Sequence, residues 1–217
     1  MAPISTRAVR VRAGSTVLDG DLTVPGDARG LVIFAHGSGS SRHSPRNREV
    51  ASVLQDAGFA TLLFDLLTTG EEEADARTGH LRFDIDLLAE RLASVVDWSR
   101  GEYEVARGPV GLFGASTGAA AALRAAAERP GDVAAVVSRG GRPDLAEPLL
   151  AGVRAPTLLL IGERDVEVLP LNEDAAAKMT CVKEVAVIPG ASHLFPEAGA
   201  LESVARHAAE WFRRYLG

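Results

Sequence analysis

Gly114-Ala115-Ser116-Thr117-Gly118 is the stretch that decides the fold of this 217-residue chain. An apolar run, 109–113, comes before it, and an alanine-rich segment, 119–127, comes after it. Ser116 is therefore expected where a strand turns sharply into a helix, which lifts its hydroxyl clear of the sheet. The glycines suit such a turn, because it is strained and the helix must pass close to neighbouring strands. We interpret the pentapeptide as a nucleophile elbow, with Ser116 as the candidate nucleophile.

The pattern on either side of the elbow predicts a mostly parallel sheet. Residues 8–12 and 16–24 read as extended segments around a turn, which predicts an N-terminal antiparallel hairpin. Short apolar runs suit parallel strands covered on both faces, and they lie at residues 31–35, 60–64, 109–113, 133–137, 157–161 and 184–188. Helical apolar spacing lies between such runs and after the last, at 50–57, 85–96 and 201–215. Alternating strands and helices predict a doubly wound α/β sheet, with ligands at the carboxyl ends of the strands.

The length of the chain predicts a single domain over residues 1–217, because it is enough for one buried core and too short for two comfortable ones. The segment 139–154 has room for little more than one short helix, so we expect no cap domain and a rather open site. The longest irregular segment is expected at 66–83. A loop of that length usually has a function or is mobile.

Composition narrows the possible partners. A formal net charge of −6 gives no general basic surface, so nucleic acid is not expected as a partner. No apolar stretch reaches the roughly 18 residues of a membrane helix, and the first residues lack the apolar core of a signal peptide. These features predict a cytoplasmic protein without membrane association, and they leave the oligomeric state open. Cys181 is the only cysteine, and the carboxylates and histidines lack ligand spacing, so neither a metal nor an organic cofactor is expected.

Two later residues complete a candidate triad. Serine is a weak nucleophile that needs a positioned base, and the base needs a third group to fix its tautomer. Asp165 comes just beyond the apolar run 157–161, which would place it beside the elbow, with Glu163 as its near rival. His193 follows the final predicted strand and precedes the final helix, so it can reach back to Ser116 as the base.

Acyl transfer also needs donors for a developing oxyanion. One is expected from the residue after the nucleophile, Thr117, and one from the loop after an early strand. The segment His36-Gly37-Ser38-Gly39 supplies that loop at the end of the run 31–35, and the Ser38 backbone amide is the expected second donor.

With these residues assigned, the chain resembles the α/β-hydrolase superfamily. The resemblance rests on the His-Gly-x-Gly loop, the elbow, Asp165 and His193, and it spans nearly the whole chain. The small size and missing cap are similar to the dienelactone hydrolase-like group. That likeness implies the α/β-hydrolase fold and a compact hydrolase that cleaves small carboxylic esters or lactones through an acyl-enzyme on Ser116. Dienelactone hydrolase itself uses a cysteine nucleophile, and the serine here puts that particular lactone in doubt.

Other functions remain open at this point. Thioesterase chemistry uses the same machinery, and a small-ligand-binding α/β domain without turnover would need only a misaligned triad. A dinucleotide-binding module is the rival from another class, because glycines follow one strand and Asp65 ends the next. Its fingerprint fails at the third glycine, where Arg42 stands, and it leaves the elbow unexplained.

Two arginines are candidates for binding the substrate. Arg42 follows the proposed oxyanion loop and Arg139 follows the run 133–137, so both are expected to border the mouth of the pocket. An arginine fork pairs bidentately with a carboxylate, which would suit an anionic ester. The alternative is that arginines of these segments pair with Asp65, Asp144 or the acidic run 71–73.

Overall fold

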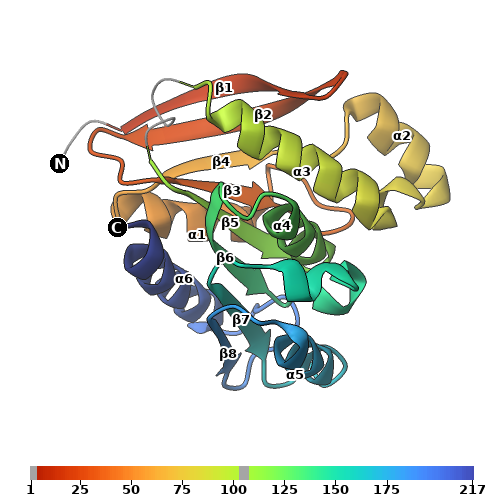
Figure 1. Ribbon diagram of the computed structural model, residues 1–217, viewed down its shortest axis with the longest axis vertical. Helices are drawn as coiled ribbons and strands as arrows, with labels where there is room; N and C mark the ends of the chain where they lie inside the picture. Colours follow the sequence, from red (N-terminus) through yellow and green to blue (C-terminus); the bar gives the residue numbers. More distant parts are fainter. Residues whose placement is uncertain (1–3, 103–107) are drawn as a thin grey trace.

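The computed structural model describes residues 4–102 and 108–217, and an eight-stranded sheet runs through it in the order β1-β2-β4-β3-β5-β6-β7-β8 (Figure 1). The strands from β3 onward pair in parallel, whereas β1 and β2 form an antiparallel hairpin that pairs with β4. The strand bounds are β1 Ile4–Ala13, β2 Thr16–Pro25, β3 Leu31–Ala35, β4 Ala60–Phe64, β5 Val110–Ala115, β6 Val133–Arg139, β7 Thr157–Gly162 and β8 Lys183–Ile188. The predicted fold class and the N-terminal hairpin are confirmed.

Helices cover both faces of the sheet because the buried strands are apolar on both sides. On one face lie α1 (Pro45–Asp56) and α6 (Ala200–Leu216), packed on a cluster that includes Phe34 and Phe113. On the other lie α3 (Ile85–Ser99), α4 (Thr117–Glu128) and α5 (Val168–Lys178). Successive residues of one strand, such as Ile33 and Phe34, belong to clusters on opposite faces, as the two-residue period of a strand requires.

The segment 66–83 is not irregular, so that prediction was wrong. It contains α2 (Thr69–Thr78) and the short 3-10 helix η1 (Leu81–Phe83). A capping box between Thr68 and Glu71 starts α2, and Gly79 ends it in the left-handed conformation at φ 67°. Both signals were present in the sequence, but α2 has no apolar stripe, and Asp75 is its only buried residue.

The segment after β6 holds two short 3-10 helices, η2 (Pro143–Ala146) and η3 (Leu149–Gly152), where one short helix was expected. Within the described ranges no cap domain interrupts the sheet, as predicted. None of the helices described is both long and apolar enough to cross a membrane.

Candidate active site

Ser116 has a backbone conformation that is rare for a residue with a side chain. Ser116 sits between β5 and α4 with φ 52° and ψ −120°, and Phe195 is the only other non-glycine residue with positive φ in the ranges described. Its N–H donates to the Arg139 carbonyl at 3.2 Å, and its carbonyl accepts from the Arg142 N–H at 3.2 Å. A non-glycine residue is held in such a conformation only where the surroundings fix it, which is the geometry of a nucleophile elbow.

The glycines on either side of Ser116 are needed for close approach. A Cβ atom on Gly114 would lie 2.4 Å from Ala119 Cα, and one on Gly118 would lie 2.3 Å from the Ala35 carbonyl oxygen. No side chain fits at such distances, because both obstacles are backbone atoms. The start of α4 therefore packs directly against the ends of β3 and β5.

Asp165 and His193 come from neighbouring loops and meet as a hydrogen-bonded pair. Asp165 follows β7 and His193 follows β8, and Asp165 Oδ2 lies 2.6 Å from His193 Nδ1. The Asp165 side chain is 10% exposed and that of His193 is 37% exposed. A carboxylate at Nδ1 fixes the tautomer that carries its proton there, which leaves Nε2 free to act as a base.

Glu163, the rival acid, has a different task. Its Oε2 accepts a hydrogen bond from the Gly190 N–H at 2.7 Å. Backbone bonds from Glu163 to Ile188 and from Arg164 to Ala191 join the same two loops. Glu163 therefore stabilises the loop that carries His193, but it makes no hydrogen bond to the His193 ring in the described ranges.

Gly140 links the Asp165–His193 pair to the elbow. A Cβ on Gly140 would lie 3.4 Å from His193 Nδ1, so the imidazole packs over this residue. Gly140 directly follows Arg139, whose carbonyl accepts the Ser116 N–H. Among the described residues no hydrogen bond joins Ser116 Oγ to His193, and such bonds commonly tighten only when substrate is bound.

The loop 36–39 lies against the other side of the nucleophile. A Cβ on Gly37 would lie 3.1 Å from Ser116 Cβ, so the loop and the elbow are in contact. The Ser38 N–H, expected to bind an oxyanion, donates to Thr117 Oγ1 at 2.9 Å. The Thr117 N–H stands at the first position of α4, where no intrahelical acceptor exists. The structure thus brings Ser38, Thr117 and Ser116 together, with the Ser38 amide held by the threonine hydroxyl.

His36 fixes this loop, a role that the sequence reasoning missed. Its Nδ1 lies 3.0 Å from the Gly37 carbonyl oxygen, and its Nε2 accepts from the Leu66 N–H at 3.1 Å. Burial lowers the pKa of His36, which keeps the ring neutral and able to accept at Nε2. The signal was its place directly after a buried strand, where a polar side chain needs partners.

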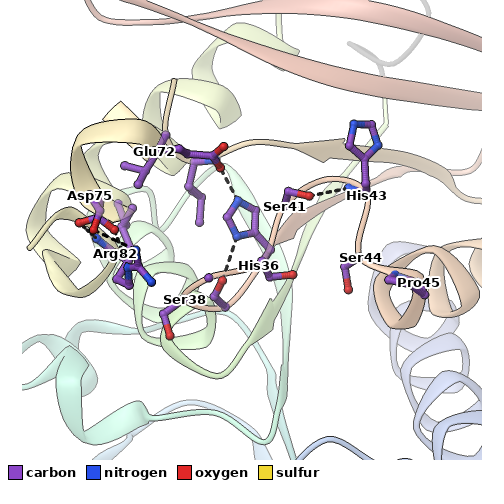
Figure 2. A pocket seen from close by; sticks show the side chains of 15 residues that line it. His36, Ser38, Ser41, His43, Ser44, Pro45, Glu72, Asp75 and Arg82 are labelled. Carbon is purple, nitrogen blue, oxygen red and sulfur yellow. Dashed lines mark hydrogen bonds and ion pairs between the residues drawn. The ribbon is translucent and has the colours of Figure 1, made fainter. Parts of the chain in front are cut away.

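A cavity of about 420 Å³ opens between the loop that carries Ser38 and the helix α2 (Figure 2). Hydroxyl and charged groups share its lining with leucines; they include Ser38, Ser40, Glu72, Arg82, Leu66 and Leu88. Arg82 Nε donates to Asp75 Oδ2 at 2.5 Å, so the arginine in the cavity wall is neutralised. The helix α2 forms one wall of this cavity, and the loop that contacts Ser116 forms another.

The helix α2 is attached to the rest of the molecule through an ion pair. Arg91, a buried residue of α3, donates to the Leu66 carbonyl at 2.7 Å and to Glu71 Oε2 at 2.8 Å. The Arg91 hydrogen bonds lower the pKa of Glu71 from 4.5 to about 2. This pair holds the start of α2 against the end of β4.

Glu71→Gln should lower the midpoint of thermal unfolding, Tm, at neutral pH, because it leaves the buried Arg91 without its anion. Since folding lowers the pKa of Glu71, the carboxylate stabilises the fold above pH 4.5, and this stabilisation is lost as the pH falls toward 2. The difference in Tm between wild type and variant should shrink over that range. Glu73→Gln, an exposed position of the same helix, is the matched control. A difference independent of pH would show that the charge of Glu71 is not responsible.

The two candidate substrate-binding arginines differ in their surroundings. The Arg42 guanidinium pairs with Asp65, and its backbone N–H donates to Asp65 Oδ1 at 2.7 Å. Arg42 thus follows the ion-pair alternative that the sequence left open. Arg139 is 6% exposed, and burial together with the nearby Arg46 charge lowers its pKa to about 10. Its Nε and Nη1 have no hydrogen-bond partner in the part of the chain described.

Comparison with known proteins agrees with the fold. Residues 26–152, more than half of the chain, match the family described as serine aminopeptidase, S33. The crystal structure of a dienelactone hydrolase from Anabaena variabilis superposes with a TM-score of 0.97 at 57% identity, over 99% of each chain. Est1E from Butyrivibrio proteoclasticus shares the fold, with a TM-score of 0.80 at 16% identity over 95% of this chain and 98% of that chain.

Two curated relatives from Mycobacterium tuberculosis carry a different name. They are provisionally named as phosphoribosyl transferases, and they are 56% identical over 99% of this chain. The chain spans 47% of their length, about half.

Proposed function

The chain belongs to the serine aminopeptidase S33 family of the α/β-hydrolase superfamily, and from this we propose that it cleaves small carboxylic esters or lactones through an acyl-enzyme on Ser116. A hydrolase is what the family and the fold support. The ester substrate and the roles of individual residues are the proposal. The observations that support it are the positive φ of Ser116 and the hydrogen-bonded Asp165–His193 pair, which Gly140 connects to the elbow.

In the first half of the reaction, Ser116 Oγ attacks the carbonyl carbon while His193 Nε2 takes its proton. Asp165 holds the other ring nitrogen and stabilises the imidazolium that forms. When the tetrahedral intermediate collapses, the bond from carbon to the alcohol oxygen breaks, and His193 returns the proton to that oxygen. The acyl group stays on Ser116.

Water completes the cycle by the same route. His193 takes a proton from the water as its oxygen attacks the acyl carbon, and it then gives the proton back to Ser116 Oγ. In both halves the backbone N–H groups of Thr117 and Ser38 are proposed to bind the oxyanion. For this the Ser38 amide must turn from Thr117 Oγ1, 2.9 Å away, or share its hydrogen with that atom.

Phosphoribosyl transfer, the activity in the name of the longer relatives, would leave the elbow and the Asp165–His193 pair without a task. The proposal concerns the half of those proteins that this chain matches. Thioester cleavage uses the same residues and remains an alternative substrate chemistry. A covalent serine probe distinguishes ligand binding without turnover from ester or thioester cleavage.

A neutral fluorophosphonate should label the folded protein once, and mass spectrometry should place the adduct on the peptide containing Ser116. Serine in an elbow with a positioned base displaces fluoride at phosphorus, whereas ordinary serines do not react. Ser192→Ala, which removes a hydroxyl next to His193 in the sequence, should label like wild type, and Ser116→Ala should not label. An adduct at another residue, or no adduct on the folded protein, would refute the proposed nucleophile.

A further inference from the structure

Arg139 lies one backbone hydrogen bond from the nucleophile. It is the last residue of β6, in register with Ala115 of β5, and its carbonyl accepts the Ser116 N–H at 3.2 Å. In-register residues of parallel strands point to the same face. Phe113 and Val137 stand two residues earlier on the same two strands, and they pack in the hydrophobic cluster that includes α1 and α6. The face to which Arg139 points is therefore the one covered by α1 and α6. The Arg139 side chain therefore lies under the elbow, toward the start of α1.

The guanidinium of Arg139 is buried, and no carboxylate pairs with it in the part of the chain that the structure describes. Its Nε and Nη1 are fully covered and have no partner within the described ranges. Nη2 likewise makes no hydrogen bond there, and the whole residue is 6% exposed. Arginines that carry ion pairs elsewhere show the contrast; they include Arg42, Arg82, Arg91 and Arg142.

The surroundings make this arrangement unfavourable for the free protein. A buried charge without a partner destabilises the folded state, and the second cation nearby, Arg46 of α1, adds repulsion. The pKa of Arg139 falls only to about 10, so the group stays charged at neutral pH. Unfavourable groups that persist beside a nucleophile are commonly kept for binding. An anion bound at Arg139 would relieve this unfavourable charge.

The sheet order indicates which part of a substrate would carry that anion. The loop with Ser38 follows β3, on one side of β5, whereas β6 and the strands that precede Asp165 and His193 lie on the other. The leaving oxygen takes its proton from His193, so the leaving group occupies this second side. Arg139 is on the same side. Arg46 itself lines a cavity of about 300 Å³ together with Glu49, Glu197 and Glu202, and these carboxylates disfavour an anion on that side of Arg46.

We infer that Arg139 binds a carboxylate or phosphate group on the leaving group of the substrate. The inference rests on the proposed hydrolase function for its place in the reaction, but anion binding by Arg139 can be measured without turnover. The charged fork of an arginine suits both groups, since each offers two oxygens in one plane to its N–H donors.

The first test measures binding in the absence of a reaction. Inorganic phosphate and acetate, each titrated at constant ionic strength, should raise the Tm of the wild-type protein, because a ligand that binds only the folded state stabilises it. Arg139→Met should abolish the rise, and without anions it should be at least as stable as wild type. Arg142→Gln, which removes a paired arginine from the same segment, should keep the rise. A less stable Arg139→Met protein, or a rise that survives in it, would overturn the inference.

The second test places the anion on the substrate. Acetate esters of 4-hydroxybenzoate and of 4-hydroxyphenyl phosphate are compared with the acetate ester of neutral 4-hydroxybenzamide, and monophenyl succinate carries the charge on the acyl side. We expect kcat/KM to favour an anionic leaving group by about 10- to 100-fold, as charged hydrogen bonds do. Arg139→Met should bring that ratio near one, and Arg142→Gln should keep it. The carboxylate and phosphate arms identify the group preferred.

A ratio unchanged in Arg139→Met, or a preference for the acyl-side charge, would refute the subsite. These failures are distinguishable from a failure of the proposed function. If the fluorophosphonate labels Ser116 and the ratio does not change, only the anion subsite is wrong. If Ser116 does not label while phosphate still raises Tm through Arg139, the subsite stands and the esterase mechanism falls.

Discussion

Ser116→Ala is expected to lower kcat for ester hydrolysis by on the order of 10³- to 10⁶-fold, with little change in fold. The variant keeps the Ser38 and Thr117 amides proposed to bind the oxyanion, but no oxygen remains to form the proposed acyl bond. Steady-state hydrolysis of a small aryl ester measures the loss, and circular dichroism checks the fold. Ser192→Ala is the matched control and should retain wild-type kcat.

His193→Ala should cause a loss of similar size, and the double variant with Ser116→Ala should lose little more. Nucleophile and base act as one unit, so that removing either one disables the step that both perform. Losses that multiply in the double variant would mean that the two residues act independently, and the assignment of His193 as base would then be wrong.

Asp165→Asn is the second substitution with a large expected effect, a fall in kcat of about 10⁴-fold. Asp165 Oδ2 lies 2.6 Å from His193 Nδ1, where the carboxylate holds the ring proton. An amide that presents its N–H group to Nδ1 would force the proton onto Nε2, and Nε2 could then no longer accept one from Ser116. The measurement is kcat for the same aryl ester, together with Tm.

Glu163→Gln provides the comparison for Asp165→Asn. Its oxygen accepts the Gly190 N–H, and glutamine retains an acceptor for that bond, so kcat should stay within a few-fold of wild type. If Glu163→Gln removed the activity and Asp165→Asn did not, the third member of the triad would be Glu163.

The sheet was predictable because buried parallel strands leave short apolar runs with clear ends. The runs 31–35 and 60–64 coincide with β3 and β4 at both ends. Chain order then placed Asp165 and His193 after neighbouring strands, and the structure joins them at 2.6 Å. Parallel strands bring their carboxyl ends to one edge, so residues that are distant in sequence could be paired from topology alone.

The parts that failed depend on signals other than apolar spacing. The helix α2 has one buried residue, so it shows no amphipathic pattern in the sequence. Only the capping residues Thr68 and Gly79 indicated that a helix lies there. The hydrogen bond from Ser38 to Thr117 Oγ1 and the isolation of Arg139 depend on distances between elements. No local pattern specifies such distances, because they are set when the elements pack.

The attachment of α2 has a consequence for how this scaffold can diversify. The helix lines the cavity, yet only one of its residues is buried. A capping box and the Arg91–Glu71 ion pair hold it in place. Substitutions along its cavity face can therefore accumulate without disturbing the packed core that positions Ser116, Asp165 and His193. For the function proposed above, directed evolution of α2 should change the range of substrates while sparing the residues proposed to carry out the reaction.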